Sequence, residues 1–515
     1  MLPRKLIILA IVLPLAGLAG YLLASPTDLD SVAYVGLLLL VLAIPLFLRW
    51  HHPMLIFSWN AALIVFFLPG APYLWMVLGI ISFSLSALQR ILDKDVRLLN
   101  VPSVTWSLIC FALVVLLTAK LTGGWGLASL GASSIGGKKY FYIWFAIIGY
   151  FALSCQRTPL PKADLYGGMY LLSGVTTVFS NLVYLAGPVA WIFYAIFPVD
   201  WAMNQAHEDF VGSPLAAKFA RLGGLAVAGH AAYAFMIMRY GVRGVLDWAK
   251  PWRLAVLMGI MALGLLGGFR GVLVFYALLF AVQFCAEGLF RSRAFPMLLV
   301  AGLMAFGMLI PFVQKLPLSI QRSLSILPLP VSVVARTDAE ASTEWRMQMW
   351  RILTPEISKH IWLGKGFSIS PTDQYLAQES VRRGMTPDYE MMILSGDYHS
   401  GPLSLLIPFG IWGVLSFLAF IIISLRVLYR NYRHGDAALL RLNTFLLSFF
   451  ITKVIIFIGV FGAIHQDVAV FAGIVGLSVS FNGGMCQAKP LLSRPAKRSE
   501  DDDAIVATNR PGRRT

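Results

Sequence analysis

The stretch of sequence with the clearest chemical potential is a polar segment that ends at His399, two residues after Asp397. A long apolar run begins at Gly401, so His399 is expected where a water-exposed loop meets a membrane helix. Histidine titrates near neutral pH, and a nearby carboxylate can orient and polarise its imidazole. The segment therefore predicts a general base at a membrane surface, with Asp397 and Ser400 as supporting residues. A structural histidine at a helix start is the alternative.

Two arginines are candidates for binding an anion. Arg270 opens an apolar segment from the side where positive charge is disfavoured, and Arg346 lies in the loop that precedes His399. Charges at membrane depth usually line a cavity or pair with a partner, and the same holds for Lys453, well inside an apolar segment. The alternatives are an interfacial anchor for Arg270, a solvated helix surface for Arg346 and a structural pair for Lys453.

The composition indicates the class of protein that must position these side chains. Hydrophobic residues make up 58% of the 515 residues and charged residues only 13%, which is typical of an all-α polytopic membrane protein. The formal charge of +16 is dispersed among short loops, so a nucleic-acid partner is not expected. The four cysteines form no CxxC pair, and the acidic residues are scattered. Neither a disulfide framework nor a metal site or cofactor is therefore expected.

Apolar segments recur along almost the whole chain, and about fourteen (twelve to fourteen) transmembrane helices are expected. The first segment is expected to be a retained signal anchor, because it lacks a clear small-residue cleavage site. The segments are 6–24, 32–48, 54–69, 72–90, 103–121, 140–155, 166–186, 222–240, 254–268, 270–290, 294–312, 401–425, 442–461 and 465–482.

Basic residues gather in alternate loops, which places both termini inside and the long 313–400 loop on the opposite side. Within this loop a helix is expected at 343–358, with Thr343 as its cap and an apolar stripe of Met347, Trp350 and Ile357. The chain is thereby divided into N-terminal transmembrane helices, a core that includes the large loop, C-terminal transmembrane helices and a disordered inside tail. Their ranges are 1–250, 251–425, 426–485 and 486–515.

A spacing around His399 resembles a known family. His399-Ser400, nine further residues and then Gly410-Ile411-Trp412-Gly413 resemble the H-[NSQ]-x9-G-x-x-G signature of the O-antigen ligase and O-antigen polymerase-related membrane glycosyltransferases. Gly410 and Gly413 are expected to let this helix pack closely against a neighbour.

Further matches stand in the same order along the chain. Arg346 to Trp350, followed by His360 to Phe367 with Gly364 and Gly366, resembles the R-x-x-x-W…HPxxGxGF stretch of that family. The turn that ends at Arg270-Gly271 resembles its SRG turn, and 210–217 is similar to its F-x-NPN-x-x-A element. Phe269 stands in place of the serine and Ile361 in place of the proline, which leaves the acceptor and the lipid contacts open.

The resemblance implies a glycosyltransferase of the bacterial inner membrane that acts on its periplasmic face. The implied donor is a glycan on a polyprenyl (undecaprenyl) diphosphate, the implied acceptor is the lipid A-core of lipopolysaccharide, and no metal is implied. His399 would be the base, and Arg270 and Arg346 would bind the diphosphate.

Two other interpretations stay open from the sequence. A polysaccharide polymerase or a protein O-oligosaccharyltransferase of the same superfamily would use the same residues with another acceptor. A polysaccharide flippase or other transporter would also have many helices, although the chain shows neither a two-fold repeat nor paired broken helices.

Overall fold

The computed structural model describes residues 29–42, 44–94, 98–130, 135–200, 221–385 and 389–488, with a few isolated positions elsewhere. Over these residues the protein is all-α, with eighteen α-helices joined by short 3-10 helices and loops. Most of the expected segment at 6–24 and the tail from 489 lie outside the described residues.

Six helical stretches of the described chain are long and apolar enough to cross a membrane, so this is a multi-pass membrane protein. They are α4 (Leu74–Leu92), α5 (Pro102–Thr122), the stretch Leu160–Ala186 that contains α7 (Ala163–Leu172) and α8 (Val178–Ala186), α18 (Gly401–His434), α19 (Leu440–Gly459) and α20 (Ile464–Asn482). Three shorter apolar helices are α11 (Trp252–Leu265), α12 (Arg270–Ala286) and α13 (Ala294–Leu309). The other α-helices are α2 (Leu29–Leu42), α3 (Ile44–Ser58), α6 (Gly137–Ser154), α10 (Gly223–Val245), α14 (Leu318–Leu324), α15 (Val333–His360), α16 (Pro371–Arg382) and α17 (Tyr389–Ser395). The larger number of twelve to fourteen spans stays a prediction.

The expected apolar segment at 54–69 is wrong as a helix over most of its length. Helix α3 ends at Ser58, and the chain then forms a loop closed by a bridge between Ile64 and Tyr73. The backbone N–H of Ile64 donates to the Ile196 carbonyl at 2.8 Å, so it is not available to a helix. Two prolines around Gly70, whose φ is +77°, favour a turn there.

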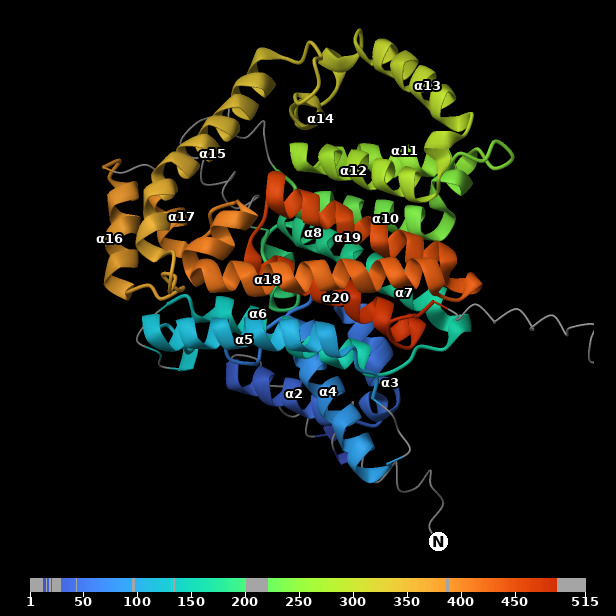
Figure 1. Ribbon diagram of the computed structural model, residues 1–515. Coiled ribbons are helices and arrows are strands. Elements are labelled where there is room, and N and C mark those ends of the chain that lie inside the picture. Colours follow the sequence, from blue (N-terminus) through green and yellow to red (C-terminus); the bar gives the residue numbers. More distant parts are fainter. Residues whose placement is uncertain are drawn as a thin grey trace, which may run out of the picture.

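Segments that are far apart in sequence form the centre of the bundle. Helix α6 packs along α20, and α5 packs along α18, so the first third of the chain encloses the last helices (Figure 1). Helices α15, α16 and α17 lie together at one end of these long helices (Figure 1). This end, where α18 also begins, is called the α15 end below.

Helix α15 is longer than the expected helix at 343–358. It begins at Val333, because the Ser332 side chain accepts a hydrogen bond from the Ala335 N–H and caps the first turn. Thr343 is therefore not a cap; it lies inside the helix, where its hydroxyl donates to the Ala339 carbonyl at 3.1 Å.

The buried stripe of α15 also differs from the expected one. Met347 and Trp350 are exposed, whereas Met349 and Leu353 are buried against Tyr398 and the start of α18. Trp345 and Ile357 flank this pair, so the apolar contacts recur every four residues. This small core fixes α15 against the segment that carries His399.

Helix α18 is broken at Gly410, where φ is +62°, two residues after Pro408. The turn after α15 supplies partners for the backbone groups that the break leaves free. Lys365 N–H donates to the Ile407 carbonyl at 2.8 Å, Gly366 N–H donates to the Pro408 carbonyl at 3.0 Å, and Ile411 N–H donates to the Ile361 carbonyl at 2.7 Å. Irregular backbone is tolerated in membrane helices when neighbouring protein satisfies it in this way.

Candidate active site

His399 lies immediately before α18 in a left-handed backbone conformation, with φ of +48°. Such a conformation is uncommon for a residue with a side chain. The imidazole is flanked by two aromatic rings, Trp345 from α15 and Phe461 from the loop after α19, each with its centroid 5.1 Å away. Burial lowers the pKa of His399 most; the charges of Arg346 and Lys139 lower it further, while Asp397 raises it. The site therefore favours the neutral imidazole that a base requires.

Asp397 contacts a lysine rather than the imidazole. Its carboxylate pairs with Lys139 Nζ at 2.7 Å and accepts a hydrogen bond from the Ser395 hydroxyl at 3.2 Å. Lys139, near the start of α6, also donates to the Ser395 carbonyl at 2.6 Å. Asp397 acts on His399 through its charge, and no hydrogen bond joins the two side chains in the described structure. The lysine thus ties the His399 segment to α6.

Arg346 follows Trp345 on α15 and is exposed, and its positive charge is close enough to act on His399. Neighbouring protein partly removes the guanidinium of Arg346 from water, which lowers its pKa most, and the charge of Arg322 lowers the pKa further. The positive charges of Arg322 and Arg346 repel the guanidinium of Arg270, which is half-buried at the start of α12. Among the described residues neither Arg270 nor Arg346 makes an ion pair or a side-chain hydrogen bond. The structure therefore places both sequence-predicted arginines in one positively charged region, with His399 beside it.

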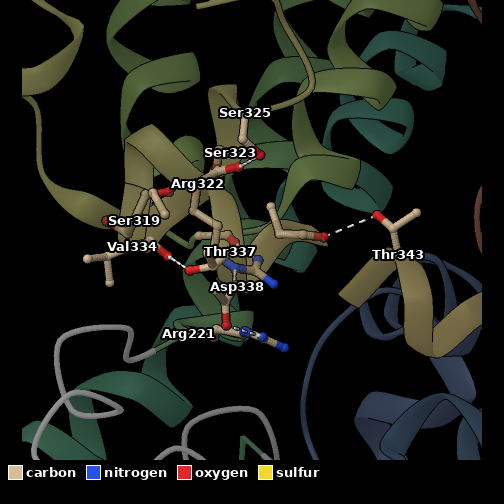
Figure 2. A network of polar contacts seen from close by, with 12 residues as sticks. Arg221, Ser319, Arg322, Ser323, Ser325, Val334, Thr337, Asp338 and Thr343 are labelled. Atoms are coloured by element: carbon tan, nitrogen blue, oxygen red, sulfur yellow. Dashed lines mark hydrogen bonds and ion pairs between the residues drawn. The ribbon is translucent and has the colours of Figure 1, made fainter. Parts of the chain in front are cut away.

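Arg322 of α14 and Asp338 of α15 point toward one another, and Arg221 approaches the same carboxylate (Figure 2). Arg322, buried on α14, donates to the Asp338 carboxylate of α15 and to the carbonyl of Gly268. Arg221 Nη2 approaches the same carboxylate at 3.4 Å. Four arginines thus surround the region, and Asp338 pairs with two of them.

The glycines of the motif have a structural role at this end of the bundle. Gly364 and Gly366 both have positive φ, of +75° and +71°, and a Cβ on Gly364 would overlap the Pro408 carbonyl. A Cβ on Gly410 would lie 2.7 Å from the Ile361 carbonyl oxygen, so the close approach is to this turn and not to a neighbouring helix. A Cβ on Gly413 would meet Phe409 of its own helix. Ser400 is buried beside His399 and precedes the first turn of α18.

Lys453 lies within α19, away from these residues in sequence. Its Nζ lies 5.1 Å from the Phe275 ring centroid and 5.6 Å from that of Phe449. The ring of His230 stacks edge-on against Phe275 at 4.4 Å, and its Nε2 is buried without a hydrogen-bond partner in the described structure. Cation–π contacts thus accompany the lysine that the sequence singled out.

Three residues of this region were missed by sequence reasoning, namely Lys139, Arg322 and Asp338. Lys139 carried a usable signal, because a positive charge on the side where basic residues are disfavoured invites a search for a carboxylate. Arg322 and Asp338 carried none, because burial of a short helix within a long polar loop has no distinct pattern. The element at 210–217 lies outside the described residues. His360 Nε2 lies 3.5 Å from the Glu356 carboxylate on the same helix.

No group of three His, Cys, Asp or Glu side chains is placed to hold a metal ion in the described parts of the chain. Comparison with models of known protein families and with curated proteins finds no match for this chain. What the residues of the α15 end do must therefore be argued from their own chemistry.

Proposed function

We propose that this protein is a membrane glycosyltransferase of the O-antigen ligase type. It moves a glycan from a polyprenyl diphosphate carrier to a lipid A-core or similar acceptor at the periplasmic face of the bacterial inner membrane. The observation that carries the proposal is the position of His399, a neutral-favouring imidazole between two aromatic rings and within reach of the charge of Arg346. Arg346 in turn acts on Arg270, and neither arginine has an ion pair among the described residues.

The arginines suit the leaving group of this reaction. When the glycosidic bond breaks, its electron pair leaves with the diphosphate, where negative charge builds up. Guanidinium groups bind phosphate oxygens in bidentate fashion, and prearranged positive charge stabilises such a leaving group. Arg270 and Arg346 have donors that no described residue occupies, so they are the groups assigned to the diphosphate.

His399 suits the other half of the reaction. The acceptor hydroxyl oxygen bonds to the anomeric carbon while its proton passes to the unprotonated imidazole nitrogen. This direct displacement inverts the anomeric centre. A base whose pKa lies below the usual histidine range stays unprotonated at neutral pH and is ready to accept the proton. Trp345 and Phe461 supply aromatic surface beside the imidazole, where a sugar ring can pack.

A reconstituted transfer assay tests the proposal. Purified protein is supplied with a polyprenyl diphosphate-linked glycan and lipid A-core in the presence of a chelator. His399→Ala and Arg270→Ala are each expected to reduce kcat/KM at least about a hundredfold, since each removes a group that acts in the transition state. Arg351→Ala serves as the control, because Arg351 is exposed on α15 and contacts only Glu344, at 3.9 Å, among the described residues.

Full activity of a folded His399→Ala variant would disprove the assignment of the base. Lengthening of the donor glycan without transfer to lipid A-core would replace the ligase by a polymerase of the same superfamily. Transfer to a protein acceptor would favour a protein O-oligosaccharyltransferase. Absence of any transfer, together with movement of the lipid-linked glycan across the bilayer, would favour a transporter.

A further inference from the structure

Arg322 is a buried charge that the proposed chemistry does not use. Its side chain is 4% exposed, and its two contacts bring together segments that are far apart in the sequence. Nε donates to the Asp338 carboxylate and Nη1 to the Gly268 carbonyl. A buried guanidinium with these partners has little surface left for a ligand, so its role must lie in what it joins.

The two groups that Arg322 joins belong to the segments that carry Arg270 and Arg346, the two arginines without an ion pair among the described residues. Gly268 precedes Arg270 by two residues, in the turn between α11 and α12. Asp338 precedes Arg346 by eight residues on α15, so the two side chains leave adjoining parts of the helix surface about 80° apart around its axis. The contact therefore sets the distance between the start of α12 and this part of α15.

Helix α14, which carries Arg322, is itself held firmly. The Ser323 hydroxyl donates to the Leu265 carbonyl at 3.0 Å, at the end of α11. The Gln321 amide donates to the Leu316 carbonyl at 2.8 Å and accepts from the Ser332 N–H at 2.9 Å, just before α15. Helix α14 is thus tied to the end of α11, five residues before Arg270, and to the residue that caps α15.

We propose that Arg322 and Asp338 form a positioning pair that holds Arg270 and Arg346 at the separation required by a diphosphate. The inference rests on the proposed function for its ligand. The pair binds no substrate; it fixes the two guanidinium groups that do. Loss of the Arg322–Asp338 contact frees α15 from the α12 turn, and a misplacement of even about 1 Å is costly for an ion-binding geometry.

Two substitutions at one position separate geometry from charge. Asp338→Asn and Asp338→Ala both remove the negative charge, but the asparagine oxygen can still accept from Arg322 and the alanine cannot. Binding of inorganic pyrophosphate to the purified full-length protein is measured by calorimetry in detergent. Asp338→Asn is expected to bind pyrophosphate as tightly as the wild type or more tightly, because a repulsive charge is gone. Asp338→Ala is expected to bind on the order of tenfold more weakly than Asp338→Asn, as for the loss of a charged hydrogen bond.

Controls make the comparison decisive. Glu340→Ala removes an exposed carboxylate two residues further along α15 and is expected to leave the affinity unchanged. Arg322→Lys keeps the charge without the forked geometry and is expected to weaken binding as Asp338→Ala does. Each variant is compared by its thermal transition in the same detergent, and only variants that stay folded are interpreted.

The inference is overturned if folded Asp338→Ala binds pyrophosphate as tightly as Asp338→Asn, or if the wild type does not bind pyrophosphate at all. If the wild type binds pyrophosphate, with the variants ranked as expected, and yet transfers no glycan, the result supports the positioning pair and disproves only the proposed glycosyltransferase activity.

Discussion

His399 is surrounded by groups that act on its proton in opposite directions. Burial and the charges of Arg346 and Lys139 favour the neutral ring, and Asp397 favours the protonated one. Because burial has the largest effect, the net pKa is below that of an ordinary histidine. In the proposed reaction, a base of this kind is expected to lose activity only when the pH falls below the usual histidine range.

The first prediction concerns the pH dependence of transfer. The acid limb of kcat/KM is expected below about pH 6.5, the ordinary value for histidine. Asp397→Asn removes the charge that raises the pKa of His399 and leaves Lys139 uncompensated, so the limb should move to still lower pH. Asp373→Asn, an exposed change on α16, should leave it in place. A limb that moves upward in Asp397→Asn would contradict the assignment of these charges.

At the scale of residues, sequence reasoning identified the groups with unusual placement but not their partners. His399 and Arg270 were singled out because each stands where its residue type is unexpected, and Arg346 mainly through the resemblance to a known motif. The lysine that binds Asp397 comes from α6, more than 250 residues earlier, and no local pattern joins the two. Partners of this kind depend on how helices pack, which the order of apolar runs leaves open.

At the scale of elements, the turn after α15 and the break in α18 complete one another. The turn places Gly364 and Gly366 against the Pro408 carbonyl region, and its N–H groups replace the helical hydrogen bonds lost at the break. The glycine spacing was visible in the sequence and was interpreted as helix packing. The glycines instead allow a contact between a helix and a turn. The break at Gly410 lies within an apolar run, so the hydrophobicity pattern gave no sign of it.

The second prediction, at the scale of elements, follows from this contact. Gly364→Ala places a Cβ into the Pro408 carbonyl and forces alanine into positive φ. Gly384→Ala is the matched control, because Gly384 also has positive φ, of +66°, but open space around it. The control should cost about 1–2 kcal/mol for the backbone conformation. Gly364→Ala should cost roughly 1–3 kcal/mol more for overpacking against backbone.

Thermal unfolding of both variants in one detergent measures the difference. Equal transitions for Gly364→Ala and Gly384→Ala would mean that the turn can move away from α18, and the contact would then not position the site. Reduced transfer activity is expected for Gly364→Ala alone, because only this change shifts the end of α15 relative to His399.

At the scale of the whole molecule, the apolar runs predicted most helices, with bounds close to those in the structure. The expected segments at 222–240 and 465–482 correspond to α10 (Gly223–Val245) and α20 (Ile464–Asn482). The neighbours of each helix did not follow from the sequence. Helix α20 is enclosed by segments from the first third of the chain, and Trp59 Nε1 donates to its Ala469 carbonyl at 3.1 Å.

The enclosure of α20 gives a prediction for the whole fold. A Cβ on Gly473 would overlap the indole of Trp59 and lie 2.5 Å from the Tyr170 hydroxyl oxygen. Gly473→Ala is therefore expected to destabilise the protein by about 1–3 kcal/mol. Gly259→Ala, on α11 with open space around it, should be neutral or stabilising, because alanine favours a helix by up to about 1 kcal/mol. The thermal unfolding transitions of both variants are compared with that of the wild type in the same detergent. A Gly473→Ala variant more stable than the wild type would contradict this packing.

Helix α15 is fixed near both ends, through Asp338 at one and through the turn at 361–366 at the other. Trp345 and Arg346 lie between these attachments, so they can move only together. An anion that shifts the α15 backbone at Arg346 is then expected to shift the Trp345 ring as well, whose centroid lies 5.1 Å from that of His399. Such coupling is reciprocal in binding free energy, so whatever occupies the space beside His399 must change the affinity for the anion by the same factor. The proposed donor and acceptor are thus expected to bind cooperatively, with one helix as the link.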